Sequence, residues 1–405
     1  LLSLAFLAFA TCGVADLTAQ RESYMQVGRW WVAKEGEEYN GSQVIKIGVP
    51  LTLSRDAKYG RVAAHMQRAF QMYFSTLAEQ RGGISVGGIR HAVELWFVDD
   101  KSETARAEQI ATTLVKSMGI KFLLGPYSSR LTEAVAHVVQ RHDAVLVASA
   151  AAARSVFSNR SRVFGVLMPA PTFLLPALQS LLELGARRFG FIQEDVKFTR
   201  DACSALAGLA QTTDIQLFGR TVEAGAAKPA VRNEMQYMKS VNIDVFVGCV
   251  YTDVCHKIME IMYELDFNPK AVVLTICVTA DGFMEAFGLR GQFVIGAAPW
   301  ATSLNLSSQL TDMSVTEFAK KYKGESGQEP PYQAAAAFAA CETLVYGLEQ
   351  AGSLDPTAVA NAIQGLAKPT IFGATSFNSN GQSEVLPMAV QFQHPTLQTY
   401  WTVAP

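Results

Sequence analysis

Short apolar segments alternate with amphipathic ones along most of this 405-residue chain. Residues 44–50 (VIKIGVP) alternate apolar residues with others, as a strand does, and residues 60–80 carry an apolar stripe at helical spacing. Consecutive strands separated by helices need crossover connections, so the pattern predicts a doubly wound parallel sheet of the α/β class. The expected elements of this first unit are strands 44–50, 92–98, 121–125 and 144–148 and helices 60–80, 102–119 and 128–142.

The same alternation restarts near residue 188 and predicts a second α/β unit. Its expected elements are strands 188–193, 215–220, 245–248 and 271–277 and helices 200–211, 228–241 and 253–265. Residues 163–182, between the units, carry no charge over a length that could span a bilayer. They contain Pro169, Pro171 and Pro176, so we expect a buried strand, a crossover loop and a helix start instead. The chain should close with helices 316–323, 332–351 and 357–366 and strands 389–392 and 399–403.

The chain opens with LLSLAFLAFA, an apolar run typical of the core of a signal peptide. We therefore expect residues 1–19 to be a signal peptide whose start is truncated, residues 20–43 to be a linker, and the protein to be exported. Five cysteines would follow the leader in an oxidising compartment, and this odd number leaves at least one unpaired. Cys249 and Cys255 are close enough in sequence to pair, but spacing alone leaves the connectivity open.

Composition and missing motifs narrow the classes of function. Lys+Arg 34 against Asp+Glu 36 gives a net charge of −2, so nucleic acid is not an expected partner. No dinucleotide fingerprint, P-loop, HExxH, GxSxG or CxxC motif is present, so we expect neither an enzyme nor a cofactor. Asp253, Cys255 and His256 fit no standard zinc spacing, and we expect no metal. The pair Asp99-Asp100 ends a strand, where helix capping is the simplest role.

A ligand is expected beyond the carboxyl ends of the parallel strands. One strand ends in Pro126-Tyr127-Ser128-Ser129 and leads into a helix, whose free N–H groups can bind a carboxylate. Ser128 as a simple helix cap is the alternative. The next strand ends in Ser149 followed by residues 150–153, all alanine, which would let a ligand approach the backbone or let elements pack closely.

Six segments, in their order and spacing, resemble one family. They are IKIGVPLTLSRDAKYG, RGGISVGGIRHAVELWFVDDKS, IKFLLGPYSS, DAVLVASAAAA, IDVFVGCVYTD and YQAAAAFAACETLVYGLEQAG. Together they resemble the type I periplasmic binding proteins, in the leucine/isoleucine/valine-binding branch, over about residues 43–404. The resemblance implies two lobes joined by three crossovers, which close on a small ligand. It implies a first lobe of residues 44–166 and 299–370 and a second of residues 167–298 and 371–405.

The resemblance also implies ligand-binding positions in the first lobe. Tyr59 matches an aromatic of the first binding loop, and Ser129, with Ser128 beside it, matches the serine that holds a ligand carboxylate. Ala151 and Ala153, which follow Ser149, match a loop that binds through its backbone. Ala153 stands where the family often has threonine, so one hydroxyl is absent.

The second lobe departs further from the family. Phe198 and Val250 stand at common tyrosine positions, with Tyr251 next to Val250, and Cys277 stands where an acidic residue often holds the ligand's amine. Leu167 replaces a frequent arginine between the lobes. The carboxylate end of the family's site is thus present and the amine end absent. A buried ammonium without a carboxylate is costly, so we expect an acid with an apolar body.

Two forms of binding protein fit the resemblance. The first is a periplasmic or extracellular solute-binding protein of the amino acid transport type that delivers its ligand to an ABC transporter permease. The second is the ectodomain of a membrane receptor, tethered to its own membrane module, and a gene that continues past Pro405 into an apolar run would favour it. An enzyme on the same doubly wound fold is the third reading.

Overall fold

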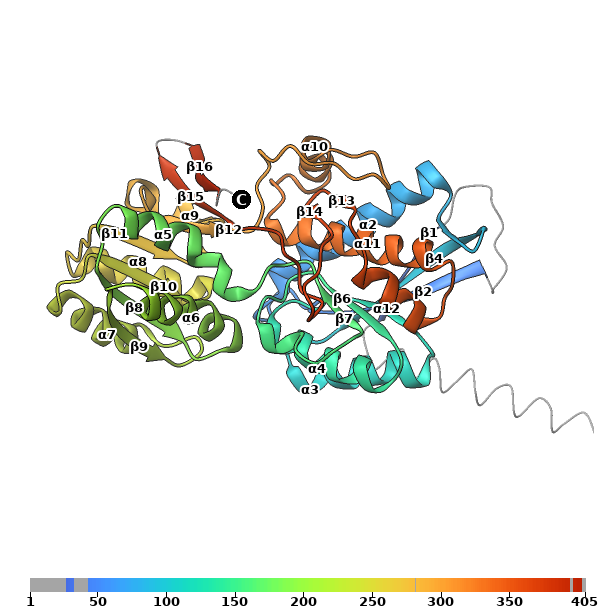
Figure 1. The fold of residues 1–405 in the computed structure, drawn as a ribbon, viewed down its shortest axis with the longest axis horizontal. Coiled ribbons are helices and arrows are strands. Elements are labelled where there is room, and N and C mark those ends of the chain that lie inside the picture. The colour runs from blue at the N-terminus through green and yellow to red at the C-terminus, as the bar shows by residue number, and fades with distance from the viewer. Residues whose placement is uncertain (1–26, 33–42, 281, 394–395, 403–405) are drawn as a thin grey trace, which may run out of the picture.

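The computed structural model describes residues 27–32, 43–280, 282–393 and 396–402, and it forms two lobes side by side (Figure 1). Each lobe is built around one mostly parallel sheet with helices on both faces. The α/β class and the doubly wound sheets predicted from the alternating pattern are confirmed. The predicted signal peptide, residues 1–19, lies outside the described residues.

The first sheet has the order β1-β4-β2-β5-β6-β7, with β3 paired to β4. Five strands run parallel to one another, in the order β4, β2, β5, β6 and β7. The strands β1 and β3 each pair antiparallel with β4. The strands are β1 (Val27–Val32), β2 (Val44–Leu51), β3 (Ile84–Val86), β4 (Ile89–Asp99), β5 (Phe122–Leu124), β6 (Val145–Ala148) and β7 (Val163–Gly165).

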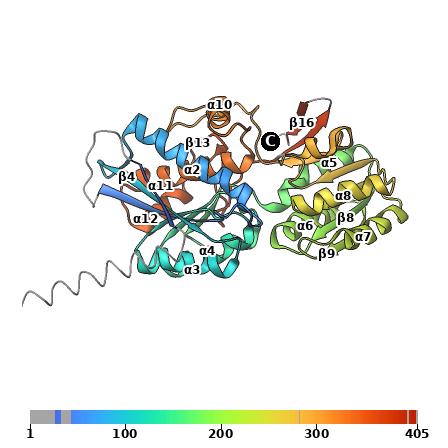
Figure 2. The same cartoon turned by 180° about the vertical axis from the view of Figure 1, so that it is seen from behind.

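Helices α2, α11 and α12 cover one face of this sheet, and α3 and α4 cover the other (Figures 1 and 2). The helices of this lobe are α2 (Gly60–Arg81), α3 (Thr104–Thr112), α4 (Ser129–Arg141), α10 (Val315–Ser326), α11 (Tyr332–Ala351) and α12 (Pro356–Gln364). A π-turn, η2 (Thr113–Ser117), continues α3, and a two-stranded ribbon pairs β13 (Pro369–Thr370) with β14 (Gly373–Ala374). Because α11 packs against α2, α12 and strands β3 and β6, almost every residue of its Ala-rich sequence is buried.

The second sheet has the order β16-β15-β12-β11-β10-β8-β9, and only β15 and β16 are antiparallel to their neighbours. Its strands are β8 (Arg188–Glu194), β9 (Gln216–Val222), β10 (Val245–Cys249), β11 (Ala271–Leu274), β12 (Ile295–Ala298), β15 (Met388–Gln393) and β16 (Thr396–Thr402). One apolar cluster packs α5 and α6 on one face, and another packs α7 and α8 on the other. The helices are α5 (Leu175–Glu183), α6 (Lys197–Thr212), α7 (Lys228–Ser240), α8 (Thr252–Glu264) and α9 (Phe283–Phe287).

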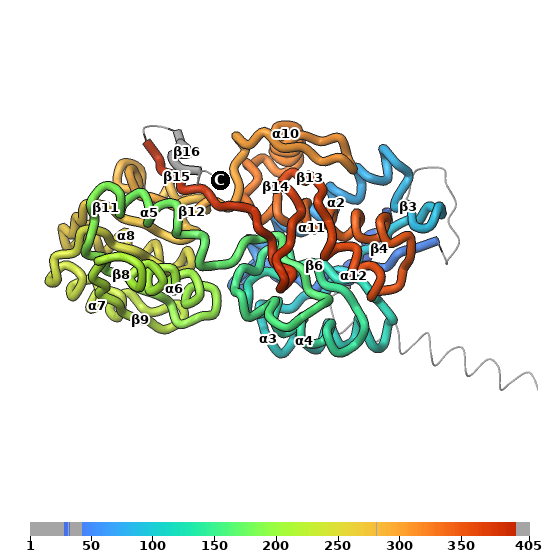
Figure 3. The backbone as a smooth tube through the Cα atoms, viewed as in Figure 1, coloured from blue at the N-terminus to red at the C-terminus, as the bar shows by residue number. Residues whose placement is uncertain are grey.

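The chain passes between the lobes three times (Figure 3): from β7 to β8, from β12 to α10, and from β14 to β15. The first passage runs through the uncharged segment 163–182, which forms β7, the 3-10 turn η4 (Ala170–Leu174) and the start of α5, as its prolines predicted. The last passage lies later than the predicted boundary at residue 370. Gln382 donates to the carbonyl of Ala152, and Phe372 joins the first core, so this stretch packs with the first lobe.

Five strands, β1, β3, β12, β13 and β14, arise where no strand was expected, and two of them, β1 and β3, belong to the first sheet. Residues 27–32, within the predicted linker 20–43, form β1 at the edge of the first sheet. The three-residue strand β3 follows α2 as one arm of a hairpin with β4. Both pair antiparallel with β4, and such short edge strands are stabilised by their partner rather than by their own pattern.

The two disulfides do not join Cys249 and Cys255, the cysteines that the sequence analysis noted as close enough to pair. Cys203 is bonded to Cys249, and Cys255 is bonded to Cys277, so Cys249 and Cys255 do not bond to each other. Cys341 is buried in α11 as a free thiol. In the ranges that the structure describes, no helix combines the length and the apolar character that crossing a bilayer requires.

Candidate functional site

A small cavity lies between the lobes, at the carboxyl ends of the strands of both sheets. The first lobe lines it from the loops after β5 and β6 and from the start of α11, and the second lobe lines it from α6 and the loops after β10 and β11. Its volume is about 10 Å³, close to the space that one water molecule needs. The lining residues are Tyr127, Ser129, Ala150, Ala152, Leu167, Phe198, Tyr251, Ile276 and Tyr332.

The loop after β5 brings a serine hydroxyl to the cavity. Ser128 adopts a left-handed backbone conformation with φ 75°, which turns the chain so that α4 starts at Ser129 beside the cavity. Ser129 Oγ accepts hydrogen bonds from the backbone N–H groups of Ala152 and Ala153, at 3.2 and 3.1 Å. A hydroxyl has two acceptor sites and one donor proton, so Ser129 keeps its O–H free to donate.

This end of the cavity is suited to an anion. The N–H groups at the start of α4 and the helix dipole make the surroundings of Ser129 electropositive. The hydroxyls of Ser128 and Ser149 are buried close by in sequence and have no hydrogen-bond partner among the described residues. The first-lobe loops thus present hydroxyl and amide donors, and they contribute no carboxylate to the lining.

Aromatic rings form most of the remaining wall. Tyr59 packs edge-on against Tyr127, with ring centroids 5.2 Å apart, and its ring lies 6.2 Å from that of Tyr251. Tyr251 in turn lies 5.8 Å from Phe198. Because Tyr59 and Tyr127 belong to the first lobe and Tyr251 and Phe198 to the second, the cluster joins the two lobes.

The cavity wall itself is uncharged. Burial raises the pKa of Tyr127, Tyr251 and Tyr332 above the ordinary tyrosine value, so all three stay neutral phenols at physiological pH. A buried acid of the second lobe, Glu194 at the end of β8, accepts hydrogen bonds from the N–H groups of Gly225 and Tyr251, at 2.8 and 2.6 Å. Both oxygens of its carboxylate are therefore hydrogen-bonded to the backbone of the second lobe.

Ion pairs join the lobes beside the cavity. Arg154 of the first lobe binds Asp201 of α6 through its backbone N–H and its guanidinium, at 2.8 and 2.6 Å. Lys197 on the first turn of α6 binds Glu133 of α4 at 2.8 Å. The arginine side chain is 57% exposed, and exposed pairs of this kind contribute little free energy, so they can break when the lobes separate.

Of the ten ligand-binding positions expected from the sequence, the structure places three on the cavity wall: Ser129, Phe198 and Tyr251. Tyr59 lies in the aromatic cluster next to it. Four other expected positions are buried in the loops after β5 and β6 but do not line the cavity: Ser128, Ser149, Ala151 and Ala153. In the loop after β6, Ala150 and Ala152 form the wall instead.

Two second-lobe positions lie away from the cavity. Val250 is buried in the core on the α7 and α8 side of the sheet. Cys277 is in the same core, bonded to Cys255, so Ile276 beside it lines the wall instead. Tyr127, Tyr332 and Ile276 were not singled out from the sequence. The only sequence signal for the two tyrosines is their place at a strand end and a helix start.

Comparison with known proteins gives a family and a fold. A family model described as periplasmic binding protein matches residues 44–391. The leucine-binding protein LivK from Thermotoga maritima has a TM-score of 0.75 and 18% identity, covering 88% of this chain and 98% of that one.

Two ligand complexes have the same fold. A solute-binding protein of an ABC transporter from Rhodopseudomonas palustris, in complex with benzoate, has a TM-score of 0.73 and 14% identity, covering 88% of this chain and 95% of that one. LivJ from Streptococcus pneumoniae, in complex with isoleucine, has a TM-score of 0.71 and 17% identity, covering 88% and 99%. At these identities the similarity shows the fold.

Proposed function

The chain belongs to the type I periplasmic binding protein family, and from that premise we propose that it is an exported solute-binding protein for a small carboxylate with an apolar body. Its two lobes bind the ligand between them without breaking a bond. The single observation that supports a carboxylate ligand is the hydrogen bonding of the Ser129 hydroxyl. Both acceptor sites of its hydroxyl are filled by backbone N–H groups, so the O–H is left as a donor on the cavity lining.

The second-lobe wall supports the apolar body. Phe198 and Ile276 face Leu167 and the tyrosine rings across the cavity, and none of the lining residues has a charged side chain. An α-amino acid would bring an ammonium group into this wall. Without an acidic partner its desolvation would be costly, and Glu194 is already bound to two backbone N–H groups. The solved relatives include complexes with benzoate and with isoleucine, and both ligands carry a carboxylate.

Ligand entry requires the lobes to separate. A cavity of about 10 Å³ cannot hold a molecule the size of benzoate, so the lobes must lie further apart around a bound ligand than they do in the described conformation. Opening would break the Arg154–Asp201 and Lys197–Glu133 pairs and part the Tyr59 and Tyr251 rings. The three passages between the lobes are the natural hinges. A ligand that contacts both lobes favours the arrangement in which the lobes enclose it, and it shifts the population towards that arrangement.

We propose an ABC-type permease as the partner that receives the ligand, because the benzoate-bound relative is a component of such a transporter. Two disulfides in the second lobe are consistent with an oxidising compartment outside the cytoplasm.

Thermal unfolding of the full chain with small solutes tests this function. The panel contains benzoate, 4-methylpentanoate (leucine without its amine), the amides of both acids, leucine, glutamate and a sugar. A ligand at 100 times its dissociation constant adds about 2.7 kcal/mol, which raises the melting temperature by several degrees. We expect shifts with the two carboxylates and not with their amides.

A pair of variants identifies the group that holds the acid. Ser129→Ala should abolish the shift, whereas Ser240→Ala, an exposed serine on α7, should leave it unchanged. Tight binding of leucine or glutamate, lost in Ser129→Ala, would contradict the proposed ligand class and show that another group holds an amine.

A further inference from the structure

Two disulfides bracket Tyr251, which lies on the second-lobe wall of the cavity. Cys249, two residues before Tyr251, is bonded to Cys203 of α6. Cys255, on the first turn of α8, is bonded to Cys277 in the loop after β11. The segment that carries Tyr251 is therefore crosslinked at both ends, to two other segments of the same lobe.

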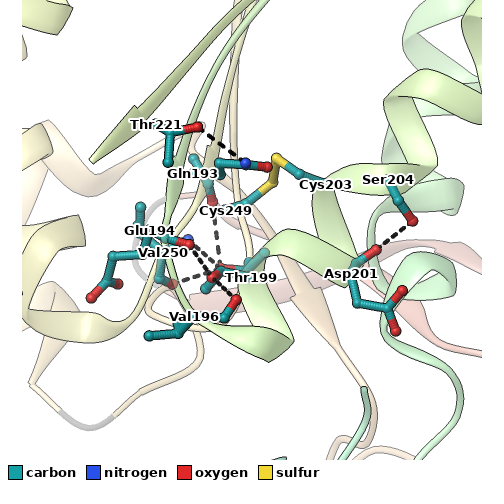
Figure 4. Close-up of a disulfide and its surroundings, with 12 residues drawn as sticks. Gln193, Glu194, Val196, Thr199, Asp201, Cys203, Ser204, Thr221, Cys249 and Val250 are labelled. Carbon is teal, nitrogen blue, oxygen red and sulfur yellow. Dashed lines mark hydrogen bonds between the residues drawn. A yellow bond between two sulfur atoms is a disulfide. The ribbon is translucent and has the colours of Figure 1, made fainter. Parts of the chain in front are cut away.

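Those two segments carry the other second-lobe residues of the wall. Phe198 lies on α6, five residues before Cys203, and Ile276 directly precedes Cys277. Figure 4 shows α6 lying across the sheet, with the Cys203–Cys249 bond joining the helix to β10. Each second-lobe residue that lines the cavity is thus on a crosslinked segment.

The crosslinks act at and beyond the end of the sheet, since Cys249 is the last residue of β10 and still pairs with Gln193 of β8. The parallel pairing of β10 with β11 ends at Gly248 and Leu274, before Tyr251 and Ile276. Beyond it, the backbone is held by side chains. Glu194 accepts from the Tyr251 N–H, and Thr275 Oγ1 donates to the carbonyl of Val250 at 2.7 Å.

The start of α6 is tied to the sheet in a similar way. Thr199 Oγ1 donates to the carbonyl of Glu194, at the end of β8, as Figure 4 shows. These polar ties hold the backbone near each strand end. The two disulfides add covalent links between the same segments, one from α6 to the residue two before Tyr251 and one from the first turn of α8 to the residue after Ile276.

We infer that the Cys203–Cys249 and Cys255–Cys277 disulfides are positioning crosslinks for the second-lobe half of the ligand site. They hold Phe198, Tyr251 and Ile276 in the binding arrangement before the ligand arrives. Ordering loops and side chains on binding weakens affinity, and a site that is already ordered avoids that loss. Ligand affinity therefore depends on the two disulfides, an inference that rests on the proposed function.

The experiment compares three forms of the full chain with the unmodified protein. Two lack one disulfide each, Cys203→Ala with Cys249→Ala and Cys255→Ala with Cys277→Ala. The third, Cys341→Ala, makes the same substitution at the buried free thiol of the first lobe and is the matched control. All are studied at a temperature where near-ultraviolet circular dichroism shows each to be folded.

Two measurements are made. Amide hydrogen exchange of residues 250–252 and 275–278 reports how ordered the cavity wall is in the absence of ligand. Calorimetry gives the affinity for benzoate and 4-methylpentanoate, and stopped flow gives their dissociation rates. We expect about tenfold faster exchange and about tenfold weaker binding in each disulfide variant, mostly through faster dissociation. Cys341→Ala should change neither.

A disulfide that only stabilises the fold would leave the affinity unchanged and would speed exchange at the core strand residues 245–248 as much as at the wall, and that result would overturn the inference. If neither probe binds the unmodified protein, the proposed function fails, and exchange alone decides whether the crosslinks order the wall. Should a variant fail to fold, the folded protein is reduced with dithiothreitol instead. Dithiothreitol converts each cystine to two thiols and is itself oxidised to a cyclic disulfide, which gives the same comparison.

Discussion

Glu342 offers a sharp test of the energetics of the first lobe. It lies in the middle of α11, fully buried, where its Oε2 accepts from the N–H of Ile371 at 3.2 Å. Its Oε1 has no partner among the described residues. Burial raises the pKa of Glu342 from 4.5 to about 8, although hydrogen bonds from Ser308 and Ile371 lower it in part. We therefore expect an uncharged Glu342 at neutral pH.

The sign of the pH dependence follows from proton binding. Between pH 4.5 and 8 the folded protein holds a proton on Glu342 that the unfolded chain has released. The free energy of unfolding then falls as pH rises through this window, by about 1.4 kcal/mol per pH unit. From pH 5.5 to 7.5 this group alone should remove roughly 2.7 kcal/mol. The neighbouring Tyr73 and Cys341 do not add to the change, because burial raises the pKa of both and keeps them neutral.

Urea unfolding of the wild type and Glu342→Gln at pH 5.5 and 7.5, followed by tryptophan fluorescence, measures this term. Glutamine has nearly the same shape, keeps an acceptor for Ile371 and does not titrate. We expect the variant to match the wild type within about 1 kcal/mol at pH 5.5 and to exceed it by roughly 2–3 kcal/mol at pH 7.5. Glu223→Gln, at an exposed site, is the control and should leave the wild-type slope unchanged. Equal slopes in wild type and Glu342→Gln would refute a neutral, buried carboxyl.

Three shorter predictions concern packing, closure and a helix end. In Gly165→Ala the new methyl would lie 2.4 Å from the Phe157 ring, so we expect a loss of about 1–3 kcal/mol in calorimetric unfolding. Arg154→Ala removes the interlobe pair with Asp201, and benzoate affinity measured by calorimetry should weaken by about twofold to fivefold, with less dependence on salt. Ser314→Ala breaks the capping box of α10 and should lower the urea-unfolding free energy by about 1 kcal/mol.

The fold was largely predictable because most elements are long and strongly patterned. The helix expected at residues 332–351 has those bounds in the structure, since its start follows Pro331 and its end precedes Gly352. The strand β1 was not predictable, because residues 27–32 gain their strand conformation only by pairing with β4. The position of the last passage between the lobes was missed for a related reason. Gln382 bonds to Ala152, which is far away in the sequence, and this contact holds the chain before β15 to the first lobe.

Several of the expected ligand-binding positions lie within one residue of a cavity-wall residue, whereas Tyr332 on the wall has no expected position beside it. Ala150 and Ala152 line the wall where Ala151 and Ala153 were expected, and Ile276 lines it beside Cys277. In an extended chain, neighbouring side chains point to opposite sides, so a shift of one residue exchanges wall for core. Sequence similarity can place a loop at the site, but the side facing the ligand depends on contacts between lobes.

The two halves of the site are built by different means, and this separates their roles. In the first lobe, a left-handed residue and a helix start place the Ser129 hydroxyl through contacts close in sequence and two backbone N–H groups. In the second lobe, side chains from three distant segments are brought together by disulfides, by hydrogen bonds of Glu194 and Thr275, and by packing. Substitution of Phe198 or Ile276 should therefore change which apolar bodies are accepted, while Ser129→Ala weakens every carboxylate alike. A panel of acids with different bodies, measured on both kinds of variant, separates these effects, and a change in body preference in Ser129→Ala would contradict the division.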